Sequence, residues 1–184
     1  MYDTVKHCLK LGLSDARTTD YLVWILQHPG QIVLTVSQVI STRDINQTFD
    51  LPAGDIDGAL IRIRDQMINT IKNVCSLVLG QVESTKLLTV EAMVTLQVHW
   101  RDIVETLIRN HVSQPGMTCA LHALIVHQVR EKNDFEWQKH LRYEWNDKDS
   151  NFQIQQADAS FPYGYEYLGC SSRLVVTPLT DRLA

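Results

Sequence analysis

Several local patterns that define large protein classes are missing from this sequence. It has no run of basic residues and a formal net charge of −4, so neither nucleic acid nor an anionic membrane is an expected partner. Its longest apolar stretches are far shorter than the roughly 18–20 residues that a membrane-spanning helix needs. The first residues, MYDTVKHCLKLGLSD, lack a basic flank followed by a long apolar core, so we expect no signal peptide there.

Cysteine is scarce and scattered. The sequence has four cysteines, far apart and without a CxxC pair: Cys8, Cys75, Cys119 and Cys170. A zinc ribbon or a disulfide framework needs closely spaced or paired cysteines, so this pattern indicates a reduced intracellular setting instead.

Potential metal ligands are closest together in the stretch CALHALIVH. Cys119 and His122 are three residues apart and would share a helix face, but His127 lies roughly 140° further round the same helix. The sequence has no HExxH motif and no fourth ligand near this group. We therefore expect no metal site, and we expect histidines that are hydrogen-bonded or exposed.

Motifs for covalent and phosphoryl chemistry are also absent. The sequence contains no GxxxxGK(S/T) phosphate loop and no GxSxG nucleophile motif. The charged residues of VHWRDIVE (Arg101, Asp102 and Glu105) are suited to ion pairs within or between helices rather than to an active site. Four aromatic residues fit the buried face of a helix better than a stacking platform for bases: Phe135, Trp137, Tyr143 and Trp145.

Hydrophobic residues at helical spacing are what the sequence has in abundance. They make up 45% of it and charged residues 21%, which is ordinary for a globular protein of 184 residues. We expect a helix over residues 2–11 with Gly12 as its stop, a short one over residues 20–27, and a third that starts at Pro29 and runs through Val39.

Two longer segments carry the strongest helical pattern. Apolar residues three and four apart form one stripe over residues 56–78, with Asp55 as a candidate cap and Gly80 as the stop. A second stripe covers residues 90–108, with Thr89 as its candidate cap. The first helix would be a rod of about 35 Å, and the short connector predicts that the two form an antiparallel helical hairpin.

The last third of the chain changes character. We expect a helix over residues 118–130 and, after a capping box at Asn133, another that runs to about Trp145. Phe152, Ile154 and Gln156 then alternate with polar residues, which is typical of a strand. The predicted fold class is mainly α: a helical bundle with a long antiparallel helical hairpin, plus a small β-rich C-terminal segment.

Five strings of residues resemble the dynein heavy chains, in the order in which that family has them. Near the C-terminus these are DFEWQKHLRYEW (residues 134–145), ASFPYGYEYLG (residues 159–169) and RLVVTPLTDR (residues 173–182). Upstream they are HPGQIVLTVSQ (residues 28–38) and LQVHWRDIV (residues 96–104). Each string alone is weak, but together they span nearly the whole chain and are highly specific.

The chain departs from the family's pattern at a few positions. His28 stands where the family often has Trp, and Trp100 replaces a small residue, so local packing must differ there. The family's phosphate loop follows the last string, and this chain ends at Ala184 before reaching one. The resemblance therefore implies a fragment of a dynein heavy chain.

In that family, the three C-terminal strings close the linker domain and enter the first AAA+ module of an ATP-driven microtubule motor. The linker is a helical lever that couples the nucleotide state of this module to movement. The resemblance implies that residues 1–150 are a helical linker subdomain. Residues 151–184 would then be a β-rich junction leading into an AAA+ ATPase module that is absent here.

The resemblance also implies ligands and partners. No catalytic residue, metal or cofactor is expected in the fragment, whereas the full-length family uses ATP or ADP with magnesium. The implied partners are the AAA+ ring of the same heavy chain and, through other regions, dynein intermediate and light chains and microtubules. The implied location is the cytoplasmic cytoskeleton and, from the wording YGYEYLG, the axoneme of a cilium or flagellum. Matching residues would line the adenine side of the nucleotide pocket once the rest of the module is present: Leu174, Val175, Thr177, Pro178, Leu179 and Thr180.

An alternative keeps the same helical body without the motor. A truncated dynein-like gene would leave a stand-alone helical module that dimerises or binds another protein. A reading frame that continues beyond Ala184 into a phosphate loop would favour the motor.

The chain alone should neither hydrolyse ATP nor bind it tightly, because phosphate binding, magnesium ligation and hydrolysis need residues that this sequence does not contain. Phosphate release from magnesium-ATP by the purified chain measures this directly. A robust magnesium-dependent rate that disappears when residues 177–180 are replaced by alanine would contradict the prediction.

Overall fold

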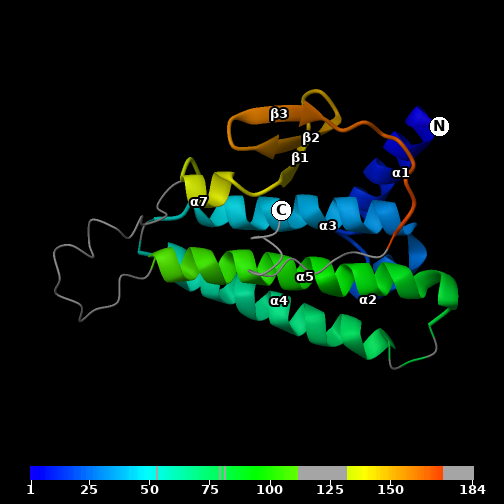
Figure 1. Ribbon diagram of the computed structural model, residues 1–184, viewed down its shortest axis with the longest axis horizontal. Helices are drawn as coiled ribbons and strands as arrows, with labels where there is room; N and C mark the ends of the chain where they lie inside the picture. Colours follow the sequence, from blue (N-terminus) through cyan, green and yellow to red (C-terminus); the bar gives the residue numbers. More distant parts are fainter. Residues whose placement is uncertain (53, 79, 81, 112–131, 172–184) are drawn as a thin grey trace, which may run out of the picture. The chain divides into compact units, whose positions relative to one another are not determined.

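Helices make up most of the chain. The computed structural model describes residues 1–52, 54–78, 80, 82–111 and 132–171. The helices are α1 (Tyr2–Asp15), α2 (Tyr21–Gln27), α3 (Gly30–Thr48), α4 (Ile56–Val78), α5 (Ser84–His111) and α7 (Phe135–Gln138), and the strands are β1 (Arg142–Asn146), β2 (Asn151–Gln156) and β3 (Ala159–Pro162) (Figure 1). The prediction of a mainly α fold with a small β segment is confirmed.

Contacts divide the chain into two compact units. The first comprises Met1–Gln38, Met67–Trp100 and Gly164–Ala184, and the second comprises Val39–Gln66 and Arg101–Tyr163. Helices α3, α4 and α5 contribute residues to both units. None of the described helices combines the length and the continuous apolarity needed to cross a bilayer.

Helix α1 is longer than the sequence predicts. Gly12 was the expected stop, but α1 continues to Asp15. A Cβ atom at Gly12 would lie 2.6 Å from Cγ2 of Ile32, so the glycine allows α1 to pack closely against α3. Its role here is close approach rather than termination.

Helix α2 begins where the sequence predicts. The side chain of Asp20 accepts hydrogen bonds from the backbone amides of Leu22 and Val23, at 3.0 and 3.3 Å. These bonds satisfy two of the amides that have no partner at a helix N-terminus. Pro29 directly precedes α3, which begins one residue after the predicted start and continues beyond Val39 to Thr48.

Helix α3 is buried on nearly all sides. Its apolar residues Ile32, Val33 and Ile45 are at most 2% exposed. Its buried polar side chains are equally enclosed, each at most 7% exposed: Gln31, Thr35, Ser37, Gln38, Ser41, Thr42 and Thr48. Gln38 and Thr48 donate to carbonyls of α3 itself, whereas Gln31 and Thr42 bond to other parts of the chain.

Helices α4 and α5 form the predicted antiparallel helical hairpin (Figure 1). The predicted stripes are buried, with Leu60 of α4 and Val104 of α5 each 0% exposed. Thr89 is not the cap of the second helix, because α5 already begins at Ser84 and Thr89 lies inside it. Thr89 is 3% exposed and belongs to the packed face.

The predicted helix over residues 134–145 is wrong beyond its first turn. The cap of α7 is Asp134 and not the predicted Asn133, and α7 ends at Gln138 before the chain forms β1. Trp145 of β1 lies opposite Phe152 of β2, with 4.7 Å between the ring centroids. Cross-strand pairing with the next strand, only four residues further along the chain, outweighs the local helical pattern.

The three strands form an antiparallel sheet in the order β1-β2-β3. The alternation at Phe152, Ile154 and Gln156 is confirmed as a strand, since all three lie in β2. Strand β3 is exposed along its length and ends at Pro162. Proline has no amide hydrogen, so it limits the pairing of this edge with another strand.

Leu107→Asp should lower the free energy of unfolding by at least about 3 kcal/mol, because it places a carboxylate at a core position of α5. Leu107 is 1% exposed, whereas Leu87 on the same helix is 41% exposed and provides the matched control. Urea denaturation of Leu107→Asp and Leu87→Asp measures the difference. Equal midpoints for the two variants would contradict the burial of the α5 stripe.

Candidate functional site

Two of the strings that resemble dynein heavy chains meet in the first unit. Residues 164–170, termed the strap, follow the sheet and contain most of YGYEYLG; they have neither helix nor strand. The strap passes beside α1 and the beginning of α3 (Figure 1). It reaches Gln31, which belongs to the string HPGQIVLTVSQ.

Gln31 holds the strap through both ends of its carboxamide. Its Nε2 donates to the backbone carbonyl of Glu166 at 2.6 Å. Its Oε1 accepts from the backbone amides of Leu168 and Gly169, at 2.7 and 3.2 Å. Gln31 itself is 7% exposed, whereas Glu166 and Leu168 of the strap are exposed, so the hydrogen bonds are partly buried. This arrangement, the glutamine clamp, fixes the backbone of the strap to the helical body.

Two glycines make the clamp possible. A Cβ atom at Gly30 would lie 2.6 Å from Oγ1 of Thr89 and 2.7 Å from Cβ of Cys170, so only glycine allows α5 and the strap to approach the start of α3. Gly169 has a φ of +71°, in the left-handed region that favours glycine. A side chain at Gly30 would collide with Thr89 and Cys170, whereas one at Gly169 would strain the backbone.

Tyr165 anchors the strap on α1. Its ring is 2% exposed and lies 4.8 Å from the ring of Tyr2 in an edge-to-face contact. Nζ of Lys6 lies 5.4 Å from the same ring, within the range of a cation–π contact. Tyr165 has a φ of +52°, an unfavourable value for a residue with a Cβ atom, and the surrounding contacts hold it there.

The turn before the clamp is held by polar contacts. Nε2 of His28 lies 3.2 Å from Oδ2 of Asp15, which ties the end of α1 to the turn between α2 and α3. Nζ of Lys86 donates to the backbone carbonyl of His28 at 2.9 Å. Nε1 of Trp24 donates to the carbonyl of Gly12 at 3.0 Å, in a buried site. These contacts hold the position from which Gln31 reaches the strap.

Tyr21 adds a further buried polar contact in this unit. Its hydroxyl accepts a hydrogen bond from Nε2 of Gln97 on α5, at 3.0 Å. Burial raises the pKa of Tyr21 above its ordinary value, and hydrogen bonds with Ser37 and Gln97 counteract part of the shift. The phenol therefore stays neutral and acts as a structural hydrogen-bonding group.

In the second unit, α3 binds the sheet and α7 in a similar way. Asn46 Oδ1 accepts from Nε1 of Trp137 at 2.9 Å, and Asn46 Nδ2 donates to Oε1 of Glu144 at 3.3 Å. Oγ1 of Thr42 accepts from the backbone amide of Tyr143 at 3.3 Å. Polar side chains of α3 thus bind backbone and side-chain groups in both units.

Arg142 in β1 shows the effect of burial on charge. Its guanidinium donates to the carbonyl of Ala157 through Nη2, at 3.1 Å. Burial lowers the pKa of Arg142, while the nearby carboxylate of Glu144 acts in the opposite direction. The group contributes to the structure of the sheet.

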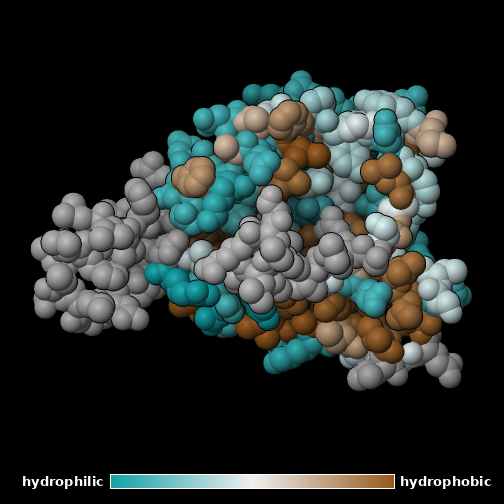
Figure 2. All heavy atoms as spheres, in the orientation of Figure 1, coloured by the Kyte–Doolittle hydropathy of each residue, from teal (hydrophilic) through white to brown (hydrophobic). Residues whose placement is uncertain are grey.

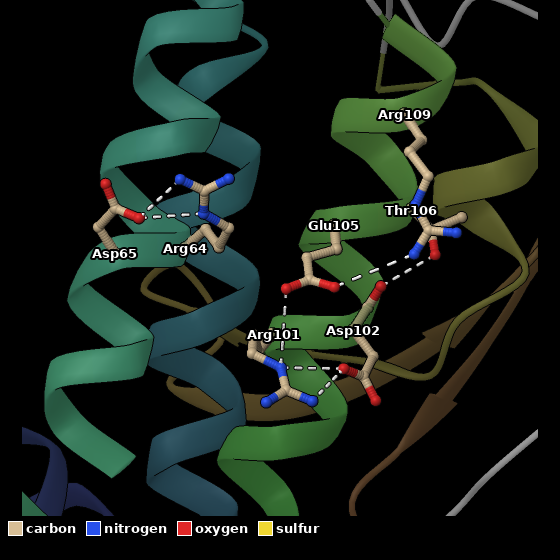
Figure 3. Close-up of polar contacts among 7 residues, drawn as sticks. All are labelled: Arg64, Asp65, Arg101, Asp102, Glu105, Thr106 and Arg109. Atoms are coloured by element: carbon tan, nitrogen blue, oxygen red, sulfur yellow. Dashed lines mark hydrogen bonds and ion pairs between the residues drawn. The ribbon is translucent and has the colours of Figure 1, made fainter. Parts of the chain in front are cut away.

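The charged residues of VHWRDIVE form ion pairs, as predicted. Nη2 of Arg101 lies 2.6 Å from Oδ1 of Asp102, and Nε of Arg101 lies 3.9 Å from Oε1 of Glu105 (Figure 3). Glu105 also approaches Arg109 at 4.0 Å. All of these groups are partly or mostly exposed, so each pair contributes at most about 1 kcal/mol. Arginines bind the carboxylates of both Asp102 and Glu105. The two carboxylates therefore do not form a pair suited to acid–base catalysis.

The residues singled out from the sequence fall partly outside the described chain. The adenine-side candidates Leu174, Val175, Thr177, Pro178, Leu179 and Thr180 lie in residues 172–184, and the possible metal ligands Cys119, His122 and His127 lie in residues 112–131; neither segment is described. Within the described residues, no group of three or more histidine, cysteine or acidic side chains is placed to hold a metal ion.

The four aromatic residues near the C-terminus do not share one helix face. Trp137 is fully buried in α7, Phe135 is 67% exposed, and Tyr143 and Trp145 lie on β1. The prediction of a common buried face is therefore wrong for three of them.

Figure 2 draws one face of the molecule. Hydrophilic and hydrophobic residues are intermingled on it, and no side of this face is uniformly hydrophilic or uniformly hydrophobic.

Gln31→Leu should release the strap, because leucine keeps the size of the side chain but can neither donate nor accept a hydrogen bond. With a net contribution of about 1 kcal/mol per bond, the amides of Leu168 and Gly169 should exchange with solvent about tenfold faster or more. Hydrogen exchange followed by NMR measures this. Gln47→Leu, at an exposed position of the same helix, is the matched control and should leave both amides unchanged. Unchanged exchange in Gln31→Leu would contradict the clamp.

Comparisons with known proteins identify the family. No protein-family model matches the chain. It is 36% identical over 182 residues to dynein axonemal heavy chain 3 of Homo sapiens, which covers 99% of this chain and 4% of that protein. It is 31% identical over 182 residues to dynein axonemal heavy chain 11 of Sus scrofa, again 99% of this chain and 4% of that protein.

A more distant relative gives the same result. The dynein-1-beta heavy chain of the flagellar inner arm I1 complex of Chlamydomonas reinhardtii is 28% identical over 182 residues, covering 97% of this chain and 4% of that protein. The chain thus spans only a small part of the length of the curated relatives it matches. Along nearly its whole length, this chain belongs to the dynein heavy chain family.

Proposed function

We propose that this chain is a linker element of an axonemal dynein heavy chain, a mechanical lever that couples the nucleotide state of the first AAA+ module to movement along microtubules. The observation that carries the proposal is the glutamine clamp. It binds Glu166, Leu168 and Gly169, which belong to the string ASFPYGYEYLG. The next string, RLVVTPLTDR, is the one that resembles the entry to an AAA+ module.

A lever transmits force only if its connection to the motor is firmly held. The three hydrogen bonds of Gln31 together contribute on the order of 2–4 kcal/mol, and the buried ring of Tyr165 adds about 2 kcal/mol. These contacts attach the strap to two helices of the first unit. A pull on the strap would therefore reach the helical body at α1 and α3 rather than stretching a loose connection.

Nucleotide chemistry belongs to the rest of the heavy chain in this proposal. ATP or ADP with magnesium would bind the first AAA+ module, and residues 174–180 would pack on the adenine side of that pocket. The AAA+ ring of the same heavy chain would be the immediate partner of this element. Intermediate chains, light chains and microtubules would bind other regions, within the axoneme of a cilium or flagellum.

In a complete heavy chain, Gln31→Leu should uncouple movement from ATP turnover. We expect the velocity of microtubule gliding to fall by about twofold or more, while basal ATPase activity falls much less, because the substitution acts on force transmission rather than on hydrolysis. Gln47→Leu is the matched control and should leave both quantities unchanged.

Two outcomes would contradict the proposal. A normal gliding velocity in Gln31→Leu would show that the clamp does not transmit force. An equal loss of ATPase activity and velocity would show that the residue serves the nucleotide site rather than the lever.

A further inference from the structure

Three exposed leucines, termed the leucine patch, gather where the strap meets α5 in the first unit. Leu87 and Leu88, near the beginning of α5, are 41% and 45% exposed, and Leu168 of the strap is 81% exposed. The strap reaches α5 two residues later, where Sγ of Cys170 lies 3.8 Å from the backbone carbonyl of Leu88. The clamp binds the backbone amide of Leu168, so this leucine is fixed to the helical body while its side chain stays in solvent.

Carboxylates border the leucine patch. Glu91 follows Leu87 by four residues and Leu88 by three, so the three side chains are neighbours on the surface of α5. Glu166 lies two residues before Leu168 in the strap. Both glutamates are exposed, and neither forms an ion pair with any residue that the structure describes. The patch therefore combines apolar side chains with a negatively charged border.

The nearest lysines do not neutralise this border by direct pairing. Nζ of Lys86, in the first turn of α5, donates to the backbone carbonyl of His28 at 2.9 Å. Nζ of Lys6 lies over the ring of Tyr165, 5.4 Å from its centroid. The chain as a whole carries a formal net charge of −4. A partner with lysine or arginine beside its apolar side chains would therefore be electrostatically complementary to the patch.

The backbone around the patch favours a helical partner. The carbonyl of Glu166 and the amides of Leu168 and Gly169 are already bound by the glutamine clamp. An extended partner segment binds through hydrogen bonds to a free backbone edge, and this part of the strap offers little of one. A helix satisfies its own backbone groups and binds through side chains, which is what the leucine patch presents.

The composition of the patch favours a separate protein over a permanent neighbour. Permanent interfaces are large and mainly apolar, whereas three leucines with free carboxylates beside them form a small and partly polar surface. We propose that the leucine patch binds an amphipathic, basic helix of a separate protein. Apolar side chains of that helix would pack on the three leucines, and its lysines or arginines would pair with Glu91 and Glu166. The proposal does not rest on the lever function.

The test uses a fluorescein-labelled peptide of about 14 residues, roughly four helical turns, with leucines on one face and lysines on the other. Fluorescence anisotropy follows its binding to the purified chain. We expect saturable binding that weakens about fivefold or more when salt is raised from about 0.05 to about 0.5 M, because salt screens exposed charges. A peptide with glutamate in place of lysine should bind at least about tenfold more weakly.

Exposed substitutions locate the site without disturbing the core. Leu168→Ser should weaken binding about tenfold, whereas Leu141→Ser, at a 44% exposed position of the second unit, is the matched control and should leave affinity unchanged. Glu91→Lys should also weaken binding about tenfold. Its control is Asp158→Lys, an exposed position of the second unit, which changes the net charge equally and should alter affinity by less than about twofold.

Five results would overturn the proposal. Equal affinity of the lysine and glutamate peptides would remove the role of charge, and unchanged affinity in Leu168→Ser or in Glu91→Lys would place binding elsewhere. Dimerisation of the chain that Leu168→Ser abolishes, measured by sedimentation equilibrium, would assign the patch to a second copy. Loss of peptide binding in a complete heavy chain would assign it to another segment of that chain. None of these measurements involves gliding velocity, so failure here is distinct from failure of the lever proposal.

Discussion

A primary carboxamide presents a hydrogen-bond donor and an acceptor side by side, and this geometry allows a single glutamine to substitute for a neighbouring strand. The strap has no secondary structure of its own, so its backbone groups need partners from elsewhere. Gln31 supplies them for Glu166, Leu168 and Gly169. The surrounding structure places that side chain: Pro29 precedes the helix start, and Gly30 lets the strap approach it.

The same use of polar side chains explains the unusual composition of α3. A helix with one solvated face would carry its polar residues on that face, but α3 buries them. Gln31 binds the strap in the first unit, and Thr42 and Asn46 bind β1 and α7 in the second. The helix therefore organises its surroundings by hydrogen bonds as well as by apolar packing. Buried hydrogen bonds of this kind select one arrangement over its alternatives, since an unpaired partner would be costly.

Periodicity predicted the long helices well because their stripes are local in sequence. Leu60 and Val104 are buried where the spacing placed them. The prediction failed where packing or pairing between elements decides the outcome. Gly12 looked like a stop, but its real neighbour is Ile32 of another helix. Trp145 looked helical, but it pairs with Phe152 in the sheet.

The clamp itself could not be deduced from spacing, because Gln31 and Glu166 are 135 residues apart. A single glutamine in the first turn of a helix has no periodic pattern that marks it. The only sequence signal for Gln31 was its place in HPGQIVLTVSQ. That string was singled out because it resembles the dynein heavy chains, and not because of the chemistry of its residues. Gly30, Gln31 and Gly169 of the two strings acquire a physical role only when the strap is seen against α3.

The arginine–aspartate neighbours of the second unit bear on how fast a partner is found. Arg43 with Asp44, Arg64 with Asp65 and Arg101 with Asp102 each pair within 3.0 Å (Figure 3 shows the last two). An arginine and an aspartate at this distance largely cancel each other's charge. Beyond the screening length of about 8–10 Å, each pair therefore produces only a weak electric field. These positions therefore add little long-range attraction, and they would do little to raise a docking protein's association rate above that set by diffusion and orientation.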